Sequence, residues 1–197
     1  MYQSYPCDYS LPAEWSPQSG IMLTWPHGGT DWKPYLRQIT DTYLELSEII
    51  TRYEQLLIAT PIVESTRRML ASRLSKEQMD RVHLYDIDSN DTWARDHGPI
   101  TLVSKNSHNG LIVPIHLLDF RFNGWGEKFA WQKDNAINLQ HYYQGAFQAA
   151  LEKHPGFVLE HGGTESEGTG TIFTTSQCVL EPPRNQPITR IDKEKKS

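Results

Sequence analysis

The sequence is poor in cysteine, with Cys7 and Cys178 as the only two among 197 residues. Two thiols cannot form a disulfide framework for a chain of this length, and no C-x-x-C pair is present to bind zinc. None of the eight histidines forms an H-E-x-x-H pattern or a pair at the same-face helix spacing, so a zinc hydrolase has little support. The cysteine content favours a cytoplasmic protein without disulfides.

Positive charge and long apolar runs are also scarce. The chain has 19 Lys and Arg against 24 Asp and Glu, a net charge of −5, which argues against a nucleic-acid partner. The most apolar stretches, residues 56–63 and 111–120, are interrupted by Thr, Pro and His and are shorter than the about 20 residues of a membrane span. Residues 1–15 lack a basic start followed by an apolar run, so we expect no secretory signal and no membrane partner.

Hydrophobic periodicity predicts alternating strands and helices within one or two domains. A helix should follow Pro34, with Asp31 as a nearby cap and an apolar stripe that runs from Leu36 to Tyr53 through Leu46. Further helices are predicted at residues 63–79 and 133–153. Strands are predicted at residues 20–25, 55–59, 82–87, 99–103, 110–120, 157–159 and 170–180.

The order strand–helix–strand–strand recurs along the chain. It is predicted around residues 54–104 and again around 111–180, which indicates repeated supersecondary units that cannot bury their apolar faces alone. Residues 181–197 are rich in Pro and Lys and are expected to be a disordered tail.

The densest polar cluster follows the predicted strand at 82–87. Asp91, Trp93 and Asp96 lie within six residues, and they supply carboxylates and an aromatic face suited to a planar cation. The alternative is a solvated Asx-rich turn in which Arg95 pairs with its own neighbours, and on spacing alone that turn is the stronger interpretation.

Two further clusters carry chemistry. Residues 160–165 combine Glu160 and His161 with paired glycines, either as an acid, base or guanidinium acceptor or as a hairpin turn that happens to be charged. Residues 122–128 place Trp125 between glycines, as a ligand platform or, more in keeping with its size, as a loop anchor in the core. Cys178 lies in an apolar strand pattern, which favours a buried structural thiol, and Cys7 has no His beside it.

Four segments together are highly specific: LPAEWSPQSGIMLTWPH, NDTWARDHGPI, FNGWGEK and VLEHGGTESEGTGTIFTTSQCVL. In this order and combination the chain resembles the agmatine deiminase and bacterial peptidylarginine deiminase family. The FNGWGEK loop has no arginine-rich segment for a substrate carboxylate, so it is more similar to the agmatine branch.

The resemblance implies an α+β fold, a pentein propeller, of which residues 1–180 would form an incomplete catalytic domain with about three of five units. It implies hydrolysis of a guanidinium to a ureido group with release of ammonia, for agmatine giving N-carbamoylputrescine in polyamine synthesis. A Cys thiolate attacks the guanidinium carbon, a His acts as acid and base, and carboxylates hold the guanidinium nitrogens. No metal or organic cofactor is used.

Residue by residue, Asp96 matches the catalytic carboxylate that grips the guanidinium, and Trp93 the aromatic beside it. Glu160 matches the glutamate of the E-x-G-G turn, where His161 stands in place of the more frequent Gly. Asn123, in the third segment, completes the expected substrate-binding residues.

The departures from the family pattern concern the reactive groups. No His has Asp two places on, so the H-x-D pattern is absent, and Cys178 matches the family's strand cysteine and not its nucleophile. The sequence resembles the amino-terminal part of a deiminase, and we expect the 197-residue chain to be inactive alone. An inactive guanidinium-binding or assembly module and a peptidylarginine deiminase remain alternatives. Open strand edges would favour self-association, as a homo-oligomer, or marginal stability.

Overall fold

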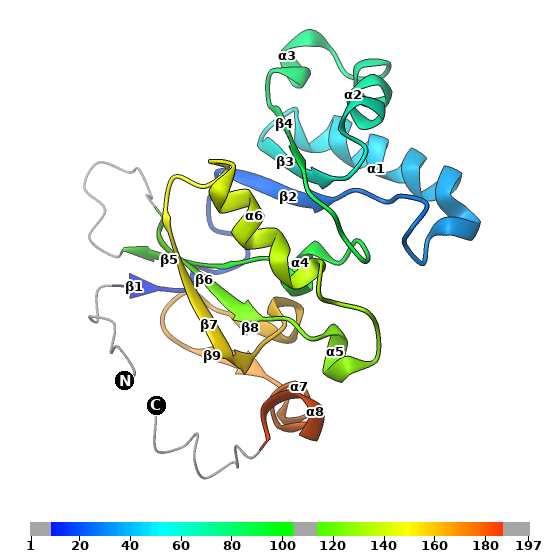
Figure 1. Cartoon of the computed structure of the whole chain (residues 1–197). Coiled ribbons are helices and arrows are strands. Elements are labelled where there is room, and N and C mark those ends of the chain that lie inside the picture. The colour runs from blue at the N-terminus through cyan, green and yellow to red at the C-terminus, as the bar shows by residue number, and fades with distance from the viewer. Residues whose placement is uncertain (1–8, 105–113, 187–197) are drawn as a thin grey trace. The chain divides into compact units, whose positions relative to one another are not determined.

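A computed structural model describes residues 9–104 and 114–186 of the chain. The chain divides into two compact units (Figure 1). Unit 1 comprises Met1–Pro17, Arg95–Phe129 and Gln148–Ser197, and unit 2 comprises Gln18–Ala94 and Ala130–Phe147. Both units contain strands and helices, which agrees with the mixed helix and strand content of the expected α+β fold.

Unit 2 is built on a parallel sheet with the order β2-β3-β4. The strands are β2 (Gly20–Thr24), β3 (Gln55–Thr60) and β4 (Val82–Asp86), close to the predicted ranges. Parallel neighbours require crossover connections. The crossovers here contain η1 (Lys33–Tyr35) with α1 (Leu36–Ile50), and α2 (Val63–Ala71) with α3 (Lys76–Met79); η3 (Asp134–Ala136) and α6 (Ile137–Tyr143) complete the unit.

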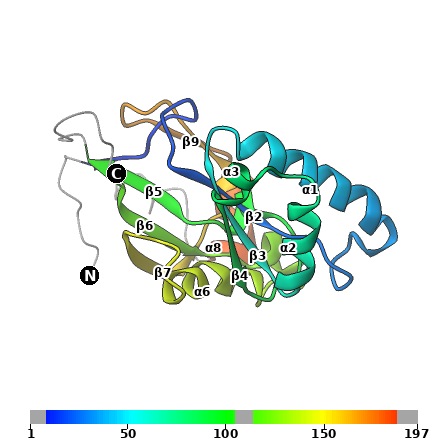
Figure 2. The ribbon, with the colours of Figure 1, turned by 90° about the horizontal axis from the view of Figure 1, so that it is seen from above.

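The two faces of this sheet bury different clusters, because successive strand residues point to opposite sides. Ile58 packs with Trp25, Tyr43 and Leu70 in a cluster that α1 and α2 cover. The next residue, Ala59, packs with Ile87, Tyr85 and Ile137 of α6. Helices α1 and α2 lie beside the sheet in both ribbon views (Figures 1 and 2).

Several local predictions in unit 2 are wrong. Leu46 and Tyr53 of the predicted stripe are 39% and 78% exposed, since the buried side of α1 is centred on Tyr43. Asp31 does not cap the helix, because the residue before η1 is Trp32 and no side-chain cap is formed. The predicted helix at 63–79 is broken in two by Ser75, whose capping box with Gln78 begins α3.

Unit 1 contains a four-stranded mixed sheet with the order β1-β5-β6-β7. Strands β1 (Tyr9–Ser10), β5 (Ile100–Ser104) and β6 (Pro114–Arg121) pair antiparallel, and β7 (Ala150–Val158) pairs parallel to β6. A separate hairpin consists of β8 (Thr164–Ser166) and β9 (Ile172–Thr174). The helical elements of this part are α4 (Ala94–His97), where the chain passes from unit 2, α5 (Gly124–Glu127), η4 (His161–Gly163), α7 (Ser176–Leu180) and α8 (Pro182–Asn185).

The predicted helix at 133–153 ends ten residues early. Helix α6 stops at Tyr143, and Gly145 follows with a φ of 75°, in the left-handed region that glycine favours. Residues 150–154 then pair with 116–120 of β6, so the predicted strand at 157–159 is only the end of β7. Hydrogen bonds to β6 outweigh the local helix propensity of the Ala-Ala-Leu-Glu-Lys segment.

The predicted strand at 170–180 is likewise shorter. Thr175 accepts the Cys178 backbone N–H at 3.2 Å and begins α7, which places Cys178 on a helix. Disorder from residue 181 is also wrong, since α8 follows directly and buries Asn185. Cys7, residues 110–113 of the predicted strand at 110–120, and residues 187–197 of the predicted tail lie outside the described residues.

The recurring strand–helix–strand–strand order does not correspond to recurring sheets. In the first copy, β3 and β4 pair within unit 2, whereas β5 pairs with β1 and β6 in unit 1. No helix within residues 9–104 and 114–186 is long and apolar enough to cross a membrane.

Candidate functional site

Two acidic side chains, Asp96 and Glu160, are brought together in unit 1. Asp96 lies on α4 and is partly buried, and Glu160 precedes η4 and is 3% exposed. Burial and the charge of Glu160 raise the pKa of Asp96, and Arg95 and hydrogen bonds from the Gly162 N–H and the Trp125 indole oppose that shift. A pair of adjacent carboxylates in a partly buried setting is suited to bind a cation.

Glycine is required at position 162 for this approach. A Cβ atom at Gly162 would overlap the Asp96 carboxylate oxygen, so a larger residue would displace the Asp96 side chain. Gly162 of the predicted E-x-G-G turn therefore allows close packing against Asp96, whereas a Cβ at Gly163 would meet the Cys178 side chain. The alternative of a simple hairpin turn is wrong, since residues 161–163 form η4.

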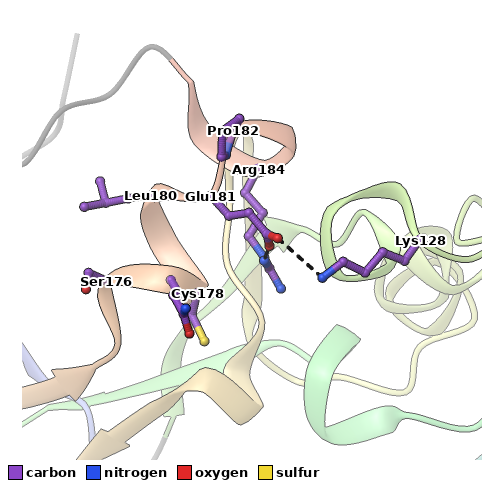
Figure 3. A pocket seen from close by; sticks show the side chains of 8 residues that line it. Lys128, Ser176, Cys178, Leu180, Glu181, Pro182 and Arg184 are labelled. Carbon is purple, nitrogen blue, oxygen red and sulfur yellow. Dashed lines mark hydrogen bonds and ion pairs between the residues drawn. The ribbon is translucent and has the colours of Figure 1, made fainter.

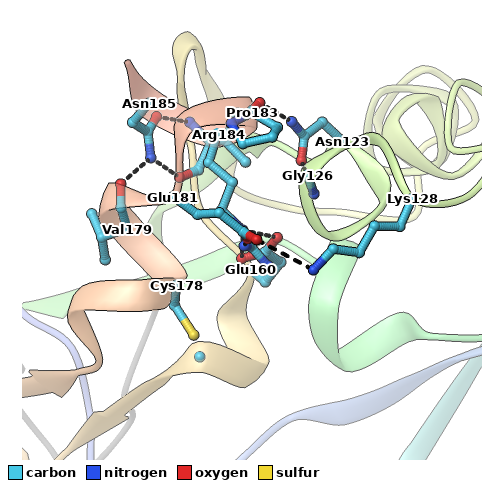
Figure 4. Close-up of polar contacts among 12 residues, drawn as sticks. Asn123, Gly126, Lys128, Glu160, Cys178, Val179, Glu181, Pro183, Arg184 and Asn185 are labelled. Carbon is cyan, nitrogen blue, oxygen red and sulfur yellow. Dashed lines mark hydrogen bonds and ion pairs between the residues drawn. The ribbon is translucent and has the colours of Figure 1, made fainter. Parts of the chain in front are cut away.

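Glu160 forms a buried ion pair with Arg184 of α8. The Arg184 Nε–H lies 2.9 Å from one carboxylate oxygen and 3.2 Å from the other, and the Arg184 side chain is 8% exposed. Arg184 also pairs through Nη1 with Glu181, which Lys128 approaches at 3.4 Å (Figure 4). Nothing in the local sequence marks Arg184, because it lies in the Pro-rich stretch predicted to be disordered.

Two asparagines hold the α8 segment in place. The Asn185 amide accepts the Val158 N–H at 2.7 Å and donates to the carbonyl oxygens of Val158 at 2.8 Å and Val179 at 3.0 Å. Asn123 donates to the Pro183 carbonyl at 2.9 Å and accepts the Gly126 N–H at 3.0 Å (Figure 4). These contacts make Asn123 an anchor of the α8 segment, and its expected role in substrate binding stays a prediction.

Trp125 is a loop anchor, the second of the two roles that the sequence left open. It adopts a left-handed conformation with φ 58°, which is uncommon for a non-glycine residue. Its ring packs edge-on against Phe122 at 5.1 Å and Phe129 at 5.7 Å, as a loop anchor does. Its indole also donates to Asp96, so the anchor positions a site carboxylate.

The first segment of unit 1 reaches the same region. Arg95 forms an ion pair with Glu14, which lies 81 positions away, whereas the turn interpretation placed its partners among its own neighbours. Burial and the charge of Arg95 lower the pKa of His161 to about 4, opposed by Glu14. His161 is therefore neutral at physiological pH. To donate a proton, it would have to do so from the neutral imidazole and not from the imidazolium.

The remaining predicted residue, Trp93, belongs to unit 2. It is 46% exposed, and its indole donates to Asp91 at 2.9 Å. The loop before it is tied by Asp134, which accepts the Asn90 and Asp91 N–H groups at 2.6 and 3.2 Å. Burial raises the pKa of Asp134 to about 6. This anchor is non-local, so the spacing of the loop alone could not predict it.

A cavity of about 670 Å³ lies beside Arg184 in unit 1 (Figure 3). Cys178 lines it together with Lys128, Glu181 and residues of α7 and α8, and is partly exposed. The predicted burial of Cys178 in a strand is therefore wrong. Within the described ranges, no group of three or more His, Cys, Asp or Glu side chains is arranged to hold a metal ion.

The comparison with protein families identifies the chain. The model of the Porphyromonas-type peptidyl-arginine deiminase family matches residues 10–196. The chain belongs to this family. The agmatine deiminase of Stutzerimonas stutzeri is 28% identical over 190 residues, which are 92% of this chain and 47% of the relative. The chain thus spans about half the length of the curated relatives it matches.

Solved structures of the deiminase family have the same architecture. A cysteine-to-serine variant of the C. jejuni agmatine deiminase with substrate bound is 31% identical, with a TM-score of 0.81 over 99% of this chain and 54% of that one. The Enterococcus faecalis agmatine deiminase, at 23% identity, shares the fold with a TM-score of 0.77 over 96% of this chain and 49% of that one. The four sequence segments thus indicated the family correctly.

Proposed function

We propose that this chain carries the guanidinium-binding part of a guanidine-group hydrolase, with Asp96 as a catalytic residue and Glu160 as its partner. The observation that supports the proposal is the close pair of carboxylates. Gly162, which has no side chain, packs directly against the Asp96 carboxylate. A guanidinium is planar, stays charged and presents N–H donors in a fixed geometry that carboxylates match.

The site environment favours a guanidinium over a simple ammonium. Glu160 already accepts a guanidinium N–H from Arg184, so its surroundings tolerate that group at hydrogen-bond distance. Partial burial of Asp96 strengthens each charged contact relative to bulk water. Trp93, three residues before Asp96 in the sequence, remains the proposed aromatic contact on the basis of the family motif.

We propose agmatine as the substrate class, since the curated relatives are named agmatine deiminases. The reaction replaces one guanidinium nitrogen with the oxygen of water and releases ammonia, giving N-carbamoylputrescine. Because the sequence lacks the H-x-D histidine, we propose that the 197-residue chain binds agmatine without turning it over. Peptidyl-arginine is the second candidate substrate, favoured by the name of the family model.

We further propose that the fold is part of a pentein propeller, about three of five units, in a cytoplasmic protein. The exposure of Ile172 and Phe173 on β9, at 56% and 60%, supports the expectation of self-association or of further polypeptide packed on this hairpin.

The test is agmatine binding by isothermal titration calorimetry, with ammonia measured in parallel. Asp96→Asn should weaken binding by about tenfold or more, because a charge-assisted hydrogen bond is lost, while thermal unfolding changes little. Glu165→Gln, which removes an exposed carboxylate from the neighbouring strand, is the matched control.

Three results would contradict parts of the proposal. Equal binding by wild type and Asp96→Asn would place the guanidinium elsewhere. Ammonia release above the buffer control would show that the chain holds a reactive group we have not assigned. Tighter binding of a blocked arginine peptide than of agmatine would favour the peptidyl-arginine branch.

A further inference from the structure

We propose that Arg184 is a positioning residue that holds the Glu160 carboxylate in place beside Asp96 and supplies the positive charge that allows two adjacent carboxylates in one site. This inference deepens the proposed function and rests on it for the identity of the ligand. Three features of unit 1 carry it: the geometry of the ion pair, the anchoring of Arg184, and the distribution of charge around the two carboxylates.

The Arg184–Glu160 contact leaves room for a ligand on Glu160. A single N–H group, on Nε, spans both carboxylate oxygens at 2.9 and 3.2 Å. Each carboxylate oxygen has two lone pairs, so both oxygens keep acceptor capacity for another donor. Arg184 therefore orients Glu160 without using up its capacity to accept hydrogen bonds.

Arg184 is itself held on several sides. Its Nη1 pairs with Glu181, a second carboxylate. The backbone on either side is fixed, because Asn123 donates to the Pro183 carbonyl and the Asn185 amide bonds to Val158 and Val179 (Figure 4). Only 8% of the Arg184 side chain is exposed, so burial and these contacts restrict its motion and that of the carboxylate it contacts.

The charges around the site also require a cation beside the Glu160 carboxylate. Glu160 is 3% exposed, and an unpaired carboxylate at that depth would be strongly unfavourable. Asp96 has Arg95 nearby and neutral donors from Gly162 and Trp125, whereas Glu160 forms its ion pair with Arg184. Without Arg184, repulsion between the two carboxylates would favour their separation.

A double-mutant cycle on agmatine binding tests the inference. Arg184→Gln should weaken agmatine binding by about tenfold or more, and Arg184→Lys should restore part of the loss by returning the charge without the planar N–H geometry. The double variant with Glu160→Gln should bind no worse than Glu160→Gln alone, because Arg184 acts through Glu160. Lys128→Gln removes a neighbouring charge whose ion pair is with the exposed side of the cluster, at Glu181, and it should change binding by less than about twofold.

Losses that multiply in the double variant, or a loss in Lys128→Gln equal to that in Arg184→Gln, would overturn the inference. Thermal unfolding of the same variants without ligand separates this outcome from failure of the proposed function. Arg184→Gln and Glu160→Gln should each lower the unfolding midpoint, and the double variant should lower it no further than the more destabilised single variant. If wild type binds no agmatine but this coupling is present, the guanidinium assignment fails and the positioning role of Arg184 stands; additive midpoint shifts would overturn the role itself.

Discussion

Replacement of Asn185 by Ala tests whether the α8 segment is an integral part of unit 1. Asn185 is 4% exposed, and its amide joins α8 to the end of β7 and to α7 through hydrogen bonds with Val158 and Val179. Alanine at this position would leave the Val158 N–H and two carbonyl oxygens without these partners in a buried environment. The position therefore combines lost hydrogen bonds with orphaned backbone groups.

The magnitude follows from the three contacts, at 2.7, 2.8 and 3.0 Å. A net contribution of about 1 kcal/mol for each gives a loss of about 3 kcal/mol in the free energy of unfolding, before any penalty for the orphaned groups. Since small domains are stable by roughly 5–15 kcal/mol, this loss would be easy to detect.

Urea unfolding followed by tryptophan fluorescence gives the free energy, and hydrogen exchange at the Val158 amide gives a local readout. The control is Gln186→Ala, since Gln186 is exposed and makes one 3.4 Å contact with the Leu180 carbonyl, so its loss should cost less than about 0.5 kcal/mol. An Asn185→Ala protein within about 1 kcal/mol of wild type, with unchanged protection at Val158, would refute the reasoning.

Other predictions concern titration and the thiol. Burial lowers the pKa of His141 from 6.5 to about 4, so the stability that neutral His141 contributes is complete above pH 6.5 and is lost as the pH falls toward 4. Over this range, the unfolding midpoint of His141→Leu should therefore decline less than that of wild type. The pKa of Asp134 is raised from 3.8 to about 6, so its contribution to stability is greatest below pH 3.8 and declines as the pH rises through 6. Asp134→Asn keeps the acceptor oxygen, so its free energy of unfolding relative to that of wild type, measured in urea, should be higher at pH 8 than at pH 5. The reverse order would contradict the raised pKa of Asp134. Because Cys178 lines a cavity, iodoacetamide should modify it in the native protein as judged by peptide mass spectrometry, and labelling only after unfolding would contradict its placement. Because Cys178 is partly exposed, Cys178→Ala should cost less than about 1 kcal/mol of stability.

Much of unit 2 could be predicted from local pattern. Short apolar runs ended by Pro, Gly or Asp gave β2, β3 and β4 within a residue or two, and Pro34 marked the first turn of the helical segment. These signals are local, since they depend on backbone restrictions and on periodicity within one element. The break at Ser75 is also local in origin, because its capping box with Gln78 lies within four consecutive residues and ends the longer apolar pattern.

The site carboxylates could be located from the sequence, but their relationship could not. Asp96 and Glu160 each follow a predicted strand within a recognisable motif, and family resemblance marked both. That Glu160 raises the pKa of Asp96, and that Gly162 must lack a side chain for the approach, are consequences of packing between segments more than sixty positions apart.

By itself the sequence determined the family, the mixture of helices and strands, and the motifs that contain the acidic residues, because motif and periodicity are properties of contiguous residues. Only the tertiary structure decided that residues 150–154 form a strand, since their hydrogen bonds go to β6 and not to their own neighbours. It likewise decided that Arg184 and Asn185 are buried, in a stretch whose composition alone predicts disorder. The physical reason is the same in both cases: the free energy that fixes these residues comes from partners distant in the chain, and no local pattern records it.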